Sequence, residues 1–304
     1  RLSADDTISC ATCHDPEKGF ADGRVIAVGI KERKGTRNSP TVLNAAFFDT
    51  QFWDGRVITL EEQAKQPIIN PNEMGMPSHD ALVEKISNIS EYKTAFQAIF
   101  GTEKITIDHI VRAIASFERT LISFNAPFDR FIAGEKDAIS ASAQRGWKLF
   151  QGKARCITCH EFNRSYPFFT NNKFHNVGVA MKGKDFEFLA RKAASSGADP
   201  SALVQEEASA ELGRYLVTKE PKDIGAFKTS GLRNIALTAP FMHDGSESTL
   251  ESVVEFYNKG GVPNPNLDGG IRPLNLSEDE KKDLVEFMKS LTSDDLAGLG
   301  ITIK

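Results

Sequence analysis

The chain has 304 residues, of which 40% are hydrophobic, and a formal net charge of −4. This length suggests about two domains, and the charge offers no basic stripe of the kind that nucleic-acid binding requires. No apolar run approaches the roughly 18 residues of a membrane span, so we expect neither a nucleic-acid partner nor a membrane span.

The first motif in the chain is Cys-x-x-Cys-His, formed by Cys10, Cys13 and His14. It is the attachment pattern of a c-type haem, in which the two sulfurs bond to the porphyrin and the histidine binds the iron. Two intervening residues let one turn of chain present both sulfurs to the same porphyrin edge. Little sequence precedes this motif, so we expect that trimming or disorder removed a helix that once led into it.

Residues 15–78 are rich in Gly, Pro and Asn and predict loops with short helices, and long loops of this kind are usually functional. Apolar residues at helical spacing predict helices over residues 80–89, 91–100 and 106–123, with Thr106 as an N-cap. We expect His79 to begin a helix and His109 to lie within one, and neither to bind iron.

A break over residues 125–137 marks the predicted boundary between a domain of residues 1–136 and one of residues 137–304. The second domain opens with a helix over residues 140–150, which leads into the second motif, Cys156, Cys159 and His160. The four cysteines of the chain all fall in the two motifs. A single zinc site would have to join two distant pairs, against the short spacing usual for zinc ligands. The sequence therefore predicts two covalently bound haem c groups.

Residues 180–212 are charged and alanine-rich and predict two surface helices without chemistry. A helix over residues 250–258 should end at Gly260 and Gly261. The last helix should begin at Ser277, where Glu280 completes a capping box, and run to about residue 291. No strand pattern is convincing, so the predicted fold class is all-α.

Six further motifs lie in order around the haem motifs. They are Asn-Ser-Pro-Thr-Val-Leu-Asn at residues 38–44, Phe-Trp-Asp-Gly-Arg at 52–56, Glu-Gln-Ala at 62–64, Asn-Pro-Asn-Glu-Met-Gly at 70–75, Leu-Arg-Asn at 232–234 and Met-His-Asp-Gly at 242–245. Together they resemble the bacterial di-haem cytochrome c peroxidases over nearly the whole chain, apart from residues 180–212. The resemblance implies two cytochrome c-like domains, with hydrogen peroxide reacting at the N-terminal haem and electrons entering or being stored at the C-terminal haem.

Two departures from that family pattern indicate its MauG-like branch. Peroxidases that need reductive activation carry an iron-capping histidine eight residues before Asn38, where this chain has Ile30, so we expect an open N-terminal haem. The distal ligand of the second haem is usually a methionine fourteen residues after His243, and here that position is Tyr257. Met242 remains the competing ligand, because Met/His ligation is common in cytochromes c.

The resemblance also implies roles for individual residues. Glu73 and Gln63, with Pro67 close by, match pocket residues beside the peroxidatic iron, and a carboxylate there suits a general acid/base. Trp53 matches a tryptophan that relays charge between the haems; the alternative is ordinary core packing.

A calcium site between the haems is implied as well, formed by Asn38 and the backbone carbonyls of Thr238 and Pro240, since oxygen ligands suit this cation. We expect Lys228 and Arg233 either to contact haem propionates or to be solvated. For His175 and His243 we expect a role in holding loops near the second haem.

The leading hypothesis is a periplasmic di-haem peroxidase whose targeting segment has been removed. Its partners would be hydrogen peroxide and a small redox protein, such as a cytochrome c or a copper protein. One alternative is oxidation of a protein substrate, as in cofactor maturation; the exit tryptophan of MauG is replaced by Ala154, which leaves Trp147 as a candidate exit. Another alternative is a plain electron carrier, which would need a sixth ligand at the first haem. Homodimer formation is left open.

Overall fold

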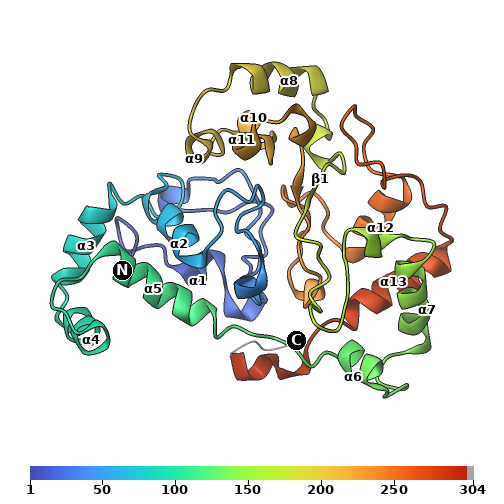
Figure 1. The fold of residues 1–304 in the computed structure, drawn as a ribbon, viewed down its shortest axis with the longest axis horizontal. Helices are drawn as coiled ribbons and strands as arrows, with labels where there is room; N and C mark the ends of the chain where they lie inside the picture. Colours follow the sequence, from blue (N-terminus) through green and yellow to red (C-terminus); the bar gives the residue numbers. More distant parts are fainter. Residues whose placement is uncertain (300–304) are drawn as a thin grey trace.

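The computed structural model describes residues 1–299 and is mostly helical, as predicted. Figure 1 shows the N-terminal half on one side, the C-terminal half on the other, and helices α8 to α11 above them. The α-helices of the N-terminal half and of the connection are α1 Cys10–Cys13, α2 Leu60–Ile69, α3 His79–Ser87, α4 Ser90–Phe100, α5 Ile107–Glu118 and α6 Pro127–Ala133. Those that follow are α7 Ala141–Gln151, α8 Phe186–Ser195, α9 Pro200–Leu203, α10 Glu207–Ala210, α11 Tyr215–Thr218, α12 Leu250–Asn258 and α13 Glu278–Lys289.

Short 3-10 turns connect these helices. They are η1 Pro16–Lys18, η2 Ile30–Glu32, η3 Ala45–Phe47, η4 Cys156–Thr158, η5 Val179–Met181, η6 Pro221–Asp223, η7 Ile235–Leu237 and η8 Asp294–Leu299. Regular structure is therefore sparse between residues 15 and 59, which confirms the prediction of a loop-rich region ahead of α2.

Local capping chemistry sets several helix starts. The Thr106 side chain accepts a hydrogen bond from the backbone N–H of His109 at the start of α5. Ser277 and Glu280 form the predicted capping box of α13, each side chain bonding the other's backbone N–H. Each such cap satisfies N–H groups that the first helical turn leaves unpaired.

The helix predicted over residues 106–123 is too long, since α5 ends at Glu118. Beyond that point the backbone carbonyl of Leu121 accepts from the N–H of Asn44, and the Asn44 side chain accepts from the N–H of Ser123. This tertiary pairing replaces the helical hydrogen bonds. The Leu121 side chain is buried with Phe20 and Leu43 instead of lying on the helix face.

The core of the C-terminal half lies between α7 and α13, which cross closely. At Gly146 an added Cβ would stand 1.9 Å from the backbone carbonyl oxygen of Asp283, so only glycine fits the crossing point. The aromatic side chains of Phe150, Phe169 and Phe287 fill this core. Helix α6, which precedes the predicted boundary at residue 136, packs Phe128 into the same core.

The prediction of two surface helices over residues 180–212 is wrong. The segment holds three short helices, α8, α9 and α10, and together with α11 it buries its own cluster of apolar side chains. Leu189, Leu212 and Leu216 in that cluster are fully buried. The sequence did not indicate this cluster, because its few large apolar residues lie in an alanine-rich segment. A four-residue helix is also too short to show a helical periodicity.

The predicted all-α fold class is confirmed, although one small sheet is present that no strand pattern in the sequence indicated. β1 Phe174–His175 and β2 Phe227–Lys228 form a two-stranded antiparallel sheet. Two-residue strands carry no alternating pattern that a sequence could show. In residues 1–299 no helix is both long and apolar enough to cross a membrane, as predicted.

Candidate active site

Two large cavities lie inside the molecule, and each is lined by one Cys-x-x-Cys-His motif. The N cavity contains Cys10, Cys13 and His14, and the C cavity contains Cys156, Cys159 and His160. With open solvent included, their empty volumes are about 1430 and 1610 Å³. Because the two cysteine pairs line different cavities, they do not form one four-cysteine zinc site.

Both motif histidines are oriented by backbone carbonyl groups. His14 Nδ1 lies 3.2 Å from the carbonyl oxygen of Phe20, and His160 Nδ1 lies 2.9 Å from that of Phe169. A carbonyl oxygen can only accept, so Nδ1 carries the proton and Nε2 keeps its lone pair for a metal. Burial lowers the pKa of His14 and lowers that of His160 to about 4, so both rings are neutral at pH 7.

The cysteines of both motifs are unpaired. Burial raises the pKa of Cys13 to about 11 and that of Cys156 to about 12. Each cavity thus holds two free thiols of one motif, the groups that form the thioether bonds of a c-type haem. Together with the free histidine nitrogens, they fit one covalently attached haem in each cavity.

The residues predicted to surround the peroxidatic iron lie together in the N cavity. Helix α2 carries Gln63 and Pro67 one turn apart, and the loop after it carries Glu73; all three line the cavity that contains His14. The Asn70 side chain donates to Glu73 Oε1 over 2.7 Å. Burial raises the pKa of Glu73, and the nearby charge of Arg56 opposes this shift. The structure thus places a half-buried, hydrogen-bonded carboxyl group in this cavity.

Ile30, at the position of the expected capping histidine, turns away from the N cavity. Its side chain is buried and packs against Gly75, where an added Cβ would stand 2.2 Å from Ile30 Cδ1. Its backbone N–H donates to the carbonyl oxygen of Glu73 over 2.8 Å. The loop that carries a capping histidine in other family members is therefore docked on the Glu73 loop here.

Known proteins resemble this chain over most of its length. The family model described as "Di-haem cytochrome c peroxidase" matches residues 1–137. Over 98% of its length the chain is 40% identical to a "Methylamine utilization protein MauG" from Methylorubrum extorquens and covers 76% of that protein. The chain belongs to the di-haem cytochrome c peroxidase family.

Other members of the family are similar along their length as well. The chain is 37% identical over 96% of its length to "Cytochrome-c peroxidase IdrP1" from Denitromonas iodatirespirans and covers 78% of it. A crystal structure of "a MauG-like protein associated with microbial copper homeostasis" aligns with a TM-score of 0.79 and 32% identity, covering 97% of this chain and 86% of that one. The predicted fold of two cytochrome c domains is thereby confirmed. So is the predicted activity: this di-haem peroxidase is an oxidoreductase that acts on hydrogen peroxide.

Trp53 occupies a central position in the di-haem peroxidase. It lines the N cavity, the C cavity and a smaller cavity that shares lining residues with both. Its indole N–H donates to the carbonyl oxygen of Asn38 over 2.9 Å, and its own carbonyl accepts from the N–H of Lys228. Trp53 is therefore held by both halves of the chain, its indole by a bond to the N-terminal half and its backbone by a bond from the C-terminal half.

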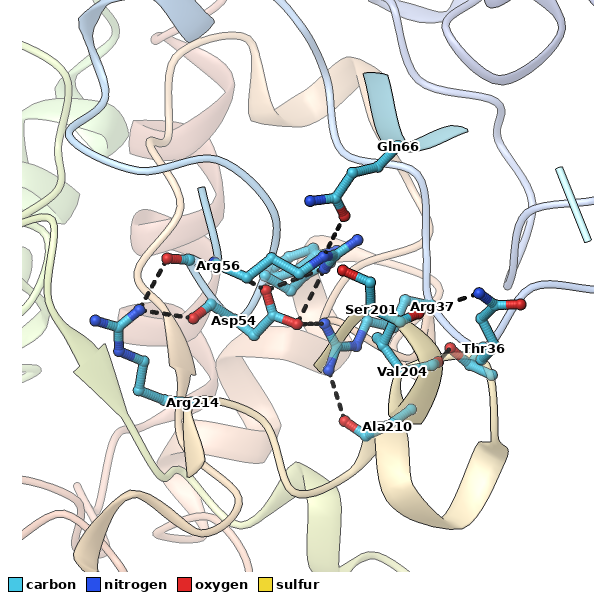
Figure 2. Close-up of polar contacts among 12 residues, drawn as sticks. Thr36, Arg37, Asp54, Arg56, Gln66, Ser201, Val204, Ala210 and Arg214 are labelled. Atoms are coloured by element: carbon cyan, nitrogen blue, oxygen red, sulfur yellow. Dashed lines mark hydrogen bonds and ion pairs between the residues drawn. The ribbon is translucent and has the colours of Figure 1, made fainter. Parts of the chain in front are cut away.

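A buried charge cluster lies directly after Trp53 (Figure 2). Asp54 is fully buried and accepts hydrogen bonds from Arg37 Nη1 at 2.7 Å and Arg56 Nη1 at 3.0 Å. Burial would raise the pKa of Asp54, but these two guanidinium groups outweigh it and hold that pKa below its usual range. Arg37 Nη2 also donates to the carbonyl oxygen of Ala210, and Arg214 donates to the backbone carbonyl of Asp54. The cluster thus joins the N-terminal half to the segment from α8 to α11.

We expect Asp54→Asn to destabilise the fold by about 3 to 5 kcal/mol, the range found when one partner of a buried ion pair is removed. The amide would leave two buried guanidinium groups without a counter-charge. Urea unfolding of the haem-loaded protein measures the loss, with the exposed Asp49→Asn as the matched control. A loss below about 1 kcal/mol, typical of exposed pairs, would contradict this role.

Both candidate distal ligands of the second haem line the C cavity. Tyr257 comes from α12, and Met242 comes from a loop position with a left-handed backbone, φ +71°. Burial raises the pKa of the Tyr257 phenol, so a phenolate at this position needs a nearby cation such as ferric iron. The geometry brings both side chains to the C cavity.

The remaining residues of the predicted site also lie near the C cavity. Asn38, Thr238 and Pro240, the residues of the expected calcium site, all line it. Lys228 donates to the carbonyl oxygen of Thr50, and burial lowers its pKa to about 8. Arg233 forms a bidentate ion pair with Asp129. Arg233 is buried in this pair, which speaks against the solvated role expected for it, while the half-buried Lys228 lines the C cavity.

The other histidines have structural partners. His79 begins α3 and His109 lies within α5, stacked on Phe100, as predicted. His243 Nε2 lies 2.9 Å from Glu211 Oε2, and His175 Nδ1 lies 2.6 Å from Asp268 Oδ2. These contacts agree with the expected role in holding loops around the C cavity.

Trp147 is not a surface group. It is 9% exposed and packs against Phe128, Phe150 and Phe287 in the core of the C-terminal half. Trp147 therefore has no exposed surface through which it could pass charge to a docked protein.

Sequence reasoning missed several residues of the N cavity. Val204, Gln205 and Glu118 line it, and burial raises the pKa of Glu118 to about 7. Arg37 and Asp54 received no role although residues 38–44 and 52–56 were recognised as motifs. Because Arg37 and Asp54 lie beside or within these motifs, the motifs could have pointed to them. Val204 and Gln205, in contrast, lie in a segment without any motif.

Proposed function

We propose that this chain is a di-haem peroxidase of the MauG-like branch, which reduces hydrogen peroxide at an open N-terminal haem. Its C-terminal haem stores or relays oxidising equivalents. One observation carries the proposal: Glu73, Gln63 and Pro67 share the N cavity with His14, while Ile30 is buried outside it. The cavity therefore has groups to handle peroxide, and the position of the capping histidine supplies no competing ligand.

We assign His14 as the axial ligand of the N-terminal haem, and His160 and Tyr257 as those of the C-terminal haem. Cys10 and Cys13 would hold the first haem, and Cys156 and Cys159 the second. When bound, the haem irons supply the electrons that reduction of peroxide consumes. The chain's own residues then have to orient peroxide and move protons.

Reduction of hydrogen peroxide to two waters takes up two electrons and two protons. Cleavage of the O–O bond is eased when a proton passes from one peroxide oxygen to the other, so that water departs instead of hydroxide. Glu73 is placed to carry this proton, since a positioned carboxyl group can accept and return it. Its raised pKa brings its basicity closer to neutral pH. Gln63 would orient peroxide by hydrogen bonding, and Pro67 would limit the space available to it.

Reaction with stoichiometric peroxide tests this proposal. The as-isolated ferric protein, mixed with one equivalent of hydrogen peroxide in a stopped-flow spectrometer, should react without prior reduction. Reaction that begins only after one electron has been added would favour a capped N-terminal haem. A failure to react in either state would favour a plain electron carrier.

Trp53 is proposed as the relay between the haems because it lines both cavities. We expect Trp53→Phe to leave the first reaction with peroxide at the N-terminal haem intact and to slow oxidation of the C-terminal haem. Phenylalanine keeps the packing but is harder to oxidise and lacks the hydrogen bond to Asn38. Stopped-flow spectra that resolve the two haems measure both rates, and equal second-phase rates in variant and parent would remove Trp53 from the path.

Four further assignments belong to the proposal. Asn38, Thr238 and Pro240 would hold one calcium ion, a hard cation suited to oxygen ligands. The chain would divide into domains at residues 1–136 and 137–304, each with one haem. Covalent haem attachment supports a periplasmic location. A small redox protein, a cytochrome c or a copper protein, would supply the electrons.

A further inference from the structure

The wall of the N cavity is not built by the N-terminal half alone. Val204 and Gln205, which follow α9, line it together with Thr36 and Arg37. They belong to the segment of residues 180–212, in which none of the family motifs occurs. A segment of the chain that carries none of these motifs thus contributes directly to the N cavity.

Specific hydrogen bonds fix this wall in place. Thr36 Oγ1 donates to the carbonyl oxygen of Val204 over 2.6 Å, and Arg37 Nη2 donates to that of Ala210 over 2.7 Å (Figure 2). A four-residue helix such as α9 has little stability of its own. Its position therefore depends on these contacts and on the apolar cluster in which Leu203 and Val204 are buried.

Gln205 is the more adjustable of the two wall residues. Its side chain is half-buried, and Nε2 donates to the carbonyl oxygen of Ser201 over 3.1 Å. This bond restrains a long side chain that would otherwise move freely. A restrained side chain in a cavity wall takes up space that a larger ligand would need.

We propose that Val204 and Gln205 act as a size-selecting wall of the N cavity, which admits hydrogen peroxide and excludes bulkier hydroperoxides. The inference rests on the proposed function, because it requires an open N-terminal haem. Thr36 acts as a positioning residue, since it holds Val204 through the backbone. The selection is steric and leaves proton transfer at Glu73 untouched.

Binding of two exogenous ligands to the ferric haem-loaded protein tests the wall without relying on turnover. Cyanide is small, and imidazole is several times larger. In the parent protein, imidazole should bind much more slowly than cyanide when both are followed optically. Gln205→Ala should speed imidazole binding by about tenfold or more and change cyanide binding by less than about twofold.

Thr36→Val provides a second variant, because it removes the hydrogen bond to Val204 at nearly constant volume. It should change imidazole binding in the same direction as Gln205→Ala. The matched control is Gln97→Ala, which shortens an exposed glutamine on α4 and should change neither rate. The oxidants should follow the same pattern as the ligands. In the parent, the bulky cumene hydroperoxide should react more slowly than hydrogen peroxide, and the two wall variants should speed mainly the reaction with cumene hydroperoxide.

Three outcomes would overturn the inference. Imidazole binding that is as fast as cyanide binding in the parent would show that no size selection exists. Unchanged imidazole rates in both Gln205→Ala and Thr36→Val would place the limiting wall elsewhere, while the proposed function would stand. A parent protein that binds neither ligand would have a closed N-terminal haem, and the proposed function would fail together with the wall.

Discussion

Glu73→Gln should slow hydrogen peroxide turnover by roughly 10²-fold or more, the contribution of a well-positioned acid/base. Glutamine has nearly the same shape and can hydrogen-bond to peroxide, but it cannot accept and return a proton. Both haem spectra should stay almost unchanged, because Glu73 is not an assigned iron ligand. Stopped-flow rates with stoichiometric peroxide report the proton-transfer effect. Comparing them with steady-state turnover separates this effect from any change in electron supply.

The control for this experiment is Glu84→Gln, which neutralises an exposed carboxylate on α3. It should leave the rate unchanged. If Glu73→Gln also turned over at the parent rate, Glu73 would be a structural carboxyl group held by Asn70, and the proton would have to travel by another route. Glu118, the other carboxyl group of the N cavity with a raised pKa, would be the next residue to test.

Tyr257→Met should raise the reduction potential of the C-terminal haem by on the order of 0.1 V or more, within the range that axial ligands command. A phenolate is a hard anionic donor that stabilises ferric iron, whereas a thioether favours ferrous iron. The parent haem should therefore hold oxidising equivalents better than it accepts electrons from a high-potential cytochrome. Spectrophotometric redox titration measures this shift.

Met242 supplies the competing variant for this prediction. Met242→Leu should leave the low-spin spectrum and the potential as they are, while Tyr257→Phe should alter both. The opposite pattern would show that Met242 is the ligand. In that case the chain would share the mechanism of the methionine-ligated peroxidases.

Features that depend on neighbouring residues could be predicted from the sequence. The capping box of Ser277 and Glu280 and the N-cap at Thr106 act within one helical turn, and both are present. The haem motifs are equally local, since five consecutive residues carry them. Gln63 and Pro67 on α2 and Glu73 on the following loop were identified by resemblance to the family, and the fold brings them into one cavity.

Features that depend on distant contacts could not be predicted in this way. Arg37, Asp54 and Ala210 meet across more than half of the chain, and no local pattern marks an arginine as the partner of a buried carboxylate. The end of α5 depends on pairing with Asn44, which lies far back in the sequence. Val204 reaches the N cavity only because the segment from α8 to α11 folds onto the other half.

The spin states of the two ferric haems test the central claim most directly. One EPR spectrum of the as-isolated protein, recorded beside its optical spectrum, reports both coordination states at once. The open N-terminal haem beside Ile30 predicts one high-spin signal, and the ligated C-terminal haem predicts one low-spin signal. Two low-spin signals, with a high-spin signal appearing only after one-electron reduction, would contradict the claim that the N-terminal haem is open.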